Sequence, residues 1–76
     1  MKISILGSTG SIGRQAIEVI QKMPGFFEVV SLTGGANLDV LRSQIKLVNP
    51  KNVCVKSEQD ALALKKEFPK INVLHG

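Results

Sequence analysis

The sequence predicts an α/β fold, β-α-β-α-β-α-β, which corresponds to half of a doubly wound parallel sheet. Short runs rich in β-branched residues alternate with segments whose apolar residues recur every three or four positions. The connections between these segments are short, as expected when each helix returns the chain to a neighbouring parallel strand. A glycine-rich turn, Gly7-Ser8-Thr9-Gly10-Ser11-Ile12-Gly13, joins the first predicted strand to the first predicted helix.

Length and composition fit one small globular domain. The chain has 76 residues, of which 43% are hydrophobic and 21% charged, which is too apolar for a disordered protein. Its net charge of +4 comes from scattered Lys and Arg residues without an aromatic stripe, which disfavours a nucleic-acid partner. The single cysteine, Cys54, excludes an internal disulfide and is expected to be buried. No secretory leader and no membrane span is recognised, so we expect a cytoplasmic protein without a membrane partner.

The first βα unit is organised around the glycine turn. Lys2–Leu6 is β-branched and apolar, which predicts a central parallel strand. A helix is predicted from Arg14 to Met23, with Ser11 as a possible cap. Pro24-Gly25 then ends it.

The second unit follows the same pattern. Phe27–Leu32 is rich in strand-forming residues, which predicts a second strand. A second amphipathic helix follows, with Asn37 as its predicted cap, and stops before Asn49-Pro50.

The remaining segments predict two more strands and one helix. Asn52–Lys56 is a short apolar strand, and Ser57 begins a helix with Asp60 in capping-box position. Pro69 closes that helix, and Ile71–Leu74 is the fourth predicted strand. The sequence leaves open whether the fourth strand pairs beside the third strand or beside the first.

The spacing of the glycine turn, Gly-x-x-Gly-x-x-Gly between a strand and a helix, is a variant of the dinucleotide-binding fingerprint. Gly7 permits a tight exit from the strand, Gly10 lets a pyrophosphate approach, and Gly13 lets the helix lie close to the strand. Thr9 and Ser11 offer hydroxyl and amide groups to phosphate oxygens. A P-loop is excluded because no Lys-Ser or Lys-Thr follows the last glycine.

The end of the second predicted strand bears on the choice of dinucleotide. A cofactor with a free ribose 2′-hydroxyl usually meets an Asp or Glu there, but no acid occurs before Asp39. This absence disfavours NAD and is compatible with a 2′-phosphate. The nearest cations are Arg14 and Arg42, and Asn37 could hydrogen-bond the ribose or the phosphate in addition to capping its helix.

At these residues the chain resembles the N-terminal part of the 1-deoxy-D-xylulose 5-phosphate reductoisomerase family. The resemblance begins with the motif Ile5–Gly13 and extends over essentially the whole chain. Its other matching segments are Phe27–Leu32, Gly35-Ala36-Asn37, Asn49-Pro50 and Val73-Leu74-His75-Gly76.

The resemblance implies NADPH as cofactor. Family members often carry a basic residue between Gly35 and Asn37, where this chain has Ala36. That difference leaves the 2′-phosphate contact open and makes Arg14 or Arg42 candidate substitutes. The cofactor-binding residues that the resemblance implies are Thr9, Gly10, Ser11, Ile12, Gly35 and Asn37.

The resemblance also implies a reaction in the non-mevalonate pathway of isoprenoid biosynthesis. The family isomerises and reduces 1-deoxy-D-xylulose 5-phosphate to 2-C-methyl-D-erythritol 4-phosphate with NADPH and Mg²⁺ or Mn²⁺. Residues 1–76 correspond to the N-terminal part of a Rossmann-type NADPH-binding domain, and the metal and substrate sites are expected beyond it. We therefore expect no catalytic residue and no metal ligand within these residues, and no activity from the 76-residue chain alone.

Two alternatives remain at this point, and one further partner is predicted. The turn also suits another NADP-dependent oxidoreductase of Rossmann type, such as a semialdehyde dehydrogenase or an extended short-chain reductase, or a non-catalytic nucleotide-binding module. Because the first strand could leave one edge unpaired, we also expect a homo-oligomer.

Overall fold

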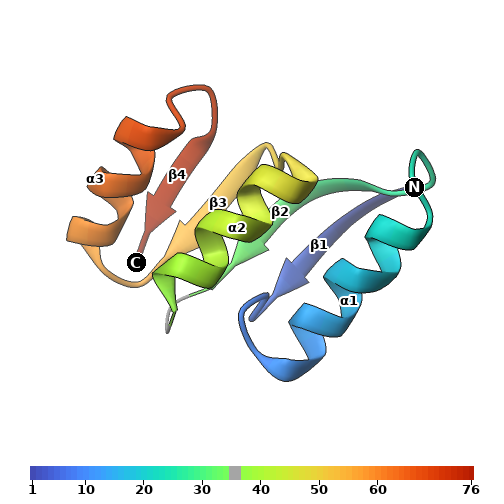
Figure 1. The fold of residues 1–76 in the computed structure, drawn as a ribbon. Helices are drawn as coiled ribbons and strands as arrows, with labels where there is room; N and C mark the ends of the chain where they lie inside the picture. Colours follow the sequence, from blue (N-terminus) through green and yellow to red (C-terminus); the bar gives the residue numbers. More distant parts are fainter. Residues whose placement is uncertain (35–36) are drawn as a thin grey trace.

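The computed structural model describes residues 1–34 and 37–76 and confirms the alternating fold (Figure 1). Every predicted strand and helix is present, with bounds that differ from the predicted ones by a few residues. In chain order the elements are β1 (Lys2–Leu6), α1 (Ser11–Lys22), β2 (Glu28–Thr33), α2 (Leu38–Val48), β3 (Asn52–Val55), α3 (Glu58–Glu67) and β4 (Asn72–His75).

The four strands form one parallel sheet in the order β1-β2-β3-β4. β4 therefore pairs beside β3, which answers the question that the sequence left open. β1 lies at the edge of this four-stranded sheet, and its central place in a complete doubly wound sheet stays a prediction. The physical reason is visible in Figure 1: each helical crossover places the next strand farther from β1, so the sheet grows in one direction along the chain.

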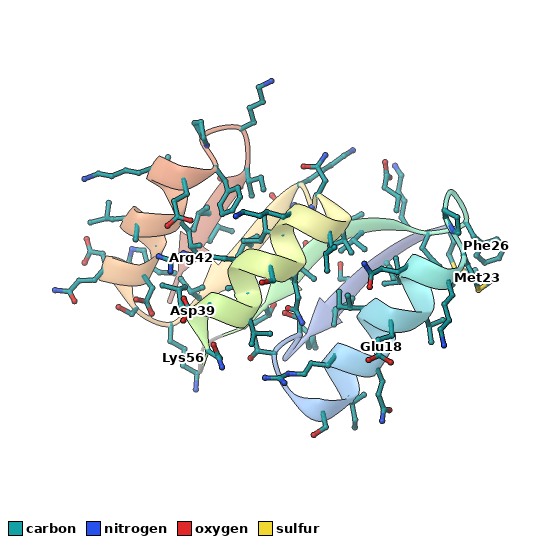
Figure 2. All side chains as sticks on the ribbon, in the orientation of Figure 1. Glu18, Met23, Phe26, Asp39, Arg42 and Lys56 are labelled. Atoms are coloured by element: carbon teal, nitrogen blue, oxygen red, sulfur yellow. The ribbon has the colours of Figure 1, made fainter. Side chains whose placement is uncertain are left out.

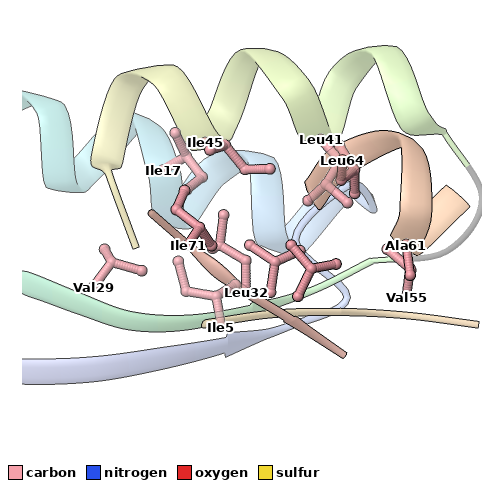
Figure 3. Packing of buried hydrophobic residues seen from close by; sticks show 12 residues of the cluster. Ile5, Ile17, Val29, Leu32, Leu41, Ile45, Val55, Ala61, Leu64 and Ile71 are labelled. Atoms are coloured by element: carbon pink, nitrogen blue, oxygen red, sulfur yellow. The ribbon is translucent and has the colours of Figure 1, made fainter. Parts of the chain in front are cut away.

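All three helices pack on the same face of the sheet, and the core lies between them and the strands (Figure 3). Alternate strand residues point into this layer because successive side chains of a strand face opposite sides. The fully buried members Leu32 and Val53 lie on the two middle strands, opposite Leu41, Ile45 and Leu64 of α2 and α3.

The opposite face of the sheet carries one polar row of side chains and a second row that includes the exposed Leu6 and Leu74. The pairing register aligns Ser4, Ser31, Asn52 and Asn72 in one row across the four strands. Within this row Asn72 Nδ2 donates to Asn52 Oδ1 at 3.1 Å. Cys54 lies in the next row and is only half-buried, so the prediction of a buried thiol is wrong.

The helix starts show where local sequence sets the structure. Asn37 Oδ1 accepts from Val40 N at 3.1 Å and Ser57 Oγ accepts from Asp60 N at 3.3 Å, so both predicted caps are confirmed. The Ser11 cap is wrong: the N-cap of α1 is Gly10, without a side-chain cap, and Ser11 is the first helical residue. No helix in the described ranges is long and apolar enough to cross a bilayer.

Candidate nucleotide-binding site

The turn between β1 and α1 is built so tightly that it requires glycine. Gly7 has φ +66°, in the left-handed region, and its carbonyl accepts from Gly10 N at 3.0 Å. Gly13, in the first turn of α1, packs directly on this turn. A Cβ at residue 13 would lie 2.4 Å from Gly7 O and 2.5 Å from Ser8 Cα, both backbone atoms. The third glycine therefore lets the helix lie against the strand exit, as its spacing predicts.

The first turn of α1 presents free amide groups. Arg14 N donates to Gly10 O at 2.9 Å, but the amides of Ser11, Ile12 and Gly13 have no acceptor within residues 1–34 and 37–76. Unpaired amides at a helix N-terminus, together with the positive end of the helix dipole, favour a bound anion. The absence of a side-chain cap at Gly10 leaves this position open to a phosphate group.

Gln44 holds the turn from inside the protein. This residue is 4% exposed, and its Nε2 donates to Ser8 O at 2.6 Å, which ties α2 to the turn. Ser8 itself is fully buried. Ser8 Oγ and Gln44 Oε1 are buried without a hydrogen-bond partner in the described part of the chain. Sequence reasoning missed Gln44, although a polar residue three positions after Leu41, on the apolar side of a helix, was the available signal.

The ends of β2 and β3 are tied to the same turn. Ser8 N donates to Thr33 O at 2.9 Å, and Gly34 N donates to Cys54 O at 3.1 Å. A Cβ at Gly34 would lie 3.2 Å from Thr9 Cγ2, so a larger residue there would press on the turn. The carboxyl ends of the first three strands are thus held together at one edge of the sheet, which is where open α/β sheets bind ligands.

A cavity of about 470 Å³ lies at this edge. Its only charged side chain among the described residues is that of Lys56, which follows the last residue of β3. The cavity is lined by Gly7, Thr9, Thr33, Gly34, Cys54, Val55, Lys56 and Gly76.

The two cations predicted from the sequence are both engaged by protein groups. Arg14 Nε donates to Thr9 O at 2.9 Å, which braces the outer side of the glycine turn. Arg42 lies within 3.1 Å of Asp39 and 2.9 Å of Glu67, so its charge is already balanced by two carboxylates. Figure 2 shows Arg42 beside Asp39, with Lys56 projecting at the same end of the molecule.

The predicted site residues fall into two groups. Thr9, Gly10, Ser11 and Ile12 form the turn and the start of α1, and Asn37 lies across the sheet edge at the start of α2. Gly35 lies outside the described residues, as does Ala36 beside it. Within residues 1–34 and 37–76, no group of three or more His, Cys, Asp or Glu residues is arranged to hold a metal ion.

Comparison with known sequences identifies a family. The family described as 1-deoxy-D-xylulose 5-phosphate reductoisomerase matches residues 3–76. The chain is 47% identical over 76 residues to the reductoisomerase of Caldanaerobacter subterraneus subsp. tengcongensis, and 45% identical over 75 residues to that of Chlamydia caviae. These alignments cover 99% and 97% of this chain but only 20% of each relative. The chain thus spans about a fifth of the length of the curated relatives it matches.

Solved structures agree with the sequence comparison. The reductoisomerase from Zymomonas mobilis in complex with NADPH matches 99% of this chain with a TM-score of 0.87 and 25% identity. A reductoisomerase in complex with NADPH, fosmidomycin and magnesium matches the whole chain with a TM-score of 0.89 and 25% identity. The chain aligns with 20% and 19% of these two proteins.

Proposed function

The chain belongs to the 1-deoxy-D-xylulose 5-phosphate reductoisomerase family, and from this premise we propose that residues 1–76 form the N-terminal part of a Rossmann-type NADPH-binding domain. The observation that carries the proposal is the uncapped start of α1 after the glycine turn, with three free amides at the carboxyl edge of the sheet. Family membership favours this proposal over the two alternatives that the sequence left open.

The described residues fit the two phosphate-bearing parts of a dinucleotide. The pyrophosphate is proposed to lie against Thr9, Gly10, Ser11 and Ile12, where free amides meet the positive end of the α1 dipole. Gly10, exposed at the N-cap, has no side chain that could keep the pyrophosphate from the turn. Gly35 and Asn37 are proposed to contact the adenine ribose, which in such folds lies at the end of the second strand. When bound, NADPH supplies the hydride for a reduction.

We propose for the whole protein the reaction that the family name implies. In this reaction 1-deoxy-D-xylulose 5-phosphate is isomerised and reduced to 2-C-methyl-D-erythritol 4-phosphate, a step of isoprenoid biosynthesis. The proposed reaction uses Mg²⁺ or Mn²⁺ and takes place in the cytoplasm. Magnesium complexes of related reductoisomerases support the metal. The described residues do not assemble a metal site, so we assign them to binding and orienting the cofactor. Residues 1–76 alone should therefore not turn over the sugar phosphate.

Titration of the chain with NADPH and NADH tests the proposal. We expect measurable binding with a preference for NADPH. Binding can be monitored by calorimetry or by the nicotinamide fluorescence, since the chain contains no Trp or Tyr that would interfere. Arg14→Ala should lower the affinity for both cofactors by a similar factor, about five- to tenfold, because Arg14 donates a hydrogen bond to Thr9 O on the pyrophosphate side. Lys22→Ala, at the far end of α1, is the control. Absence of binding to either cofactor would overturn the assignment.

We also propose that residues 1–76, prepared on their own, form a homo-oligomer. Among the described residues β1 pairs only with β2, so the other edge of β1 is available for pairing, and Leu6 on that strand is 83% exposed. Sedimentation velocity over a range of concentrations tests this idea. A single monomeric species throughout that range would contradict it.

A further inference from the structure

We infer that Lys56 supplies the positive charge that binds the ribose 2′-phosphate and so selects NADPH over NADH. The inference rests on the proposed function and names a residue that neither the glycine motif nor the family resemblance points to. It starts from the cavity at the carboxyl edge of the sheet, where the Lys56 ammonium is the single charged side chain among the described lining residues.

The backbone places Lys56 next to the expected ribose position. In doubly wound folds the ribose 2′-position lies at the end of the second strand. Here that end is fixed to β3, because Gly34 N donates to Cys54 O at 3.1 Å and Thr33 pairs with Cys54 in the sheet. Lys56 is two residues beyond Cys54, and both line the cavity together with Gly34. Its flexible four-carbon stem allows the ammonium to follow a phosphate at this edge.

The other candidate cations are less suited to this role. Arg42 is held between Asp39 and Glu67, so a phosphate would have to compete with two carboxylates for it. Arg14 donates to Thr9 O and stands at the start of α1, on the pyrophosphate side of the turn. Lys56 forms no ion pair with any side chain in the described ranges, and no Asp or Glu side chain lines the cavity. A dianionic 2′-phosphate would therefore meet Lys56 without competition from an acidic side chain in the described lining.

The absence of an acid at the end of β2 has a matching explanation. An Asp or Glu there would bind a free 2′-hydroxyl and repel a 2′-phosphate. This chain has Gly34 at the end of β2 and a lysine at the end of β3, so it removes the repulsive charge on one strand and provides an attractive charge on the next. The missing acid after β2 and the lysine after β3 should therefore both favour binding of NADPH over NADH.

The test uses 2′,5′-ADP and 5′-AMP, which differ by the 2′-phosphate and probe only the adenosine half of the site. Calorimetric titrations of the full-length protein compare wild type with Lys56→Met, which keeps the stem and removes the charge. We expect Lys56→Met to lower the affinity for 2′,5′-ADP by about tenfold and to change the affinity for 5′-AMP by less than about twofold. Lys56→Arg should restore most of the affinity. Lys51→Met, an exposed position just before β3, should have no effect.

Each outcome separates this inference from the proposed function. An unchanged affinity of Lys56→Met for 2′,5′-ADP, or equal losses for both nucleotides, would overturn the role of Lys56 while leaving the dinucleotide site intact. Equal wild-type affinities for the two nucleotides would also overturn it, because no 2′-phosphate contact would then exist. If wild type bound neither nucleotide nor NADPH, the proposed function itself would fail. Added salt should reduce the difference in 2′,5′-ADP affinity between wild type and Lys56→Met, since salt screens an exposed charge.

Discussion

Replacing Gly13 with alanine should force α1 away from the glycine turn. A Cβ at this residue would lie 2.4 Å from Gly7 O and 2.5 and 2.7 Å from Ser8 Cα and C. Because non-bonded carbon atoms rest about 3.5–4.0 Å apart, the helix would have to retreat by about 1 Å. All three contacts are with backbone atoms, so no side chain can move aside to relieve them.

The size of the effect follows from two opposing contributions. Overpacking costs about 1–3 kcal/mol, and the rigid backbone contacts place Gly13→Ala at the upper end. The better helix propensity of alanine offsets about 1 kcal/mol of this cost. The free energy of unfolding should therefore fall by about 2 kcal/mol, out of a total of about 4–11 kcal/mol for a domain of this size. With a urea m-value of about 1 kcal/mol/M, the midpoint should fall by about 2 M.

Urea unfolding of the chain, followed by far-ultraviolet circular dichroism, measures this shift. Gly10→Ala is the matched control, since a Cβ there lies 3.4 Å from Gly7 O and the backbone has φ −79°. That variant should lose less than about 1 kcal/mol of stability. It should also lose NADPH binding, because a methyl group at residue 10 would obstruct the proposed approach of the pyrophosphate. An unchanged midpoint for Gly13→Ala would refute the close-packing argument, as would equal losses of stability in the two variants.

Three further predictions concern the polar contacts of α2. Gln44→Leu should cost about 1 kcal/mol, because Ser8 O loses the donor at 2.6 Å. Gln44→Glu should cost more at neutral pH, since burial raises the pKa of the introduced carboxyl above its unfolded value. The folded state then binds more protons, so the penalty should shrink as the pH falls toward about 4, which urea titrations at several pH values check. A pH-independent penalty would contradict this reasoning. Arg42→Ala should lower the free energy of unfolding by less than about 1 kcal/mol, because its ion pairs with Asp39 and Glu67 are partly exposed. High salt should remove most of that difference in a thermal melt, and a large salt-independent loss would argue against it.

The sequence was sufficient to predict every element because local signals and packing agree along this chain. Asn37 and Ser57 cap their helices as predicted, since a cap depends on only the next three residues. The prediction that Ser11 caps α1 was wrong because Gly10 has the extended backbone of the N-cap. Ser11 is therefore the first residue of the helix. Serine and glycine both favour caps, so spacing alone could not place the helix start between them.

The parts of the site that could not be predicted depend on contacts between distant segments. The hydrogen bond from Gln44 to Ser8 spans 36 residues, and no local pattern encodes its partner. Lys56 was predicted as the end of a strand, but only the sheet order brings it to the cavity that contains Thr9. The ion pair of Arg42 with Glu67 likewise joins α2 to α3, whereas its pair with Asp39 lies within α2.

The order of strands in the sheet has a consequence for how the chain acquires its structure. Because spatial order equals chain order, each strand needs only the preceding βα unit in order to pair. Paired residues lie 20 to 27 positions apart in every strand pair, so no step has to close a longer loop. A ribosome releases the segments in that same order, so β2 can add to β1, and β3 to β2, before synthesis of β4 is complete. The glycine turn, encoded first, would then be in place before the cavity beside it closes.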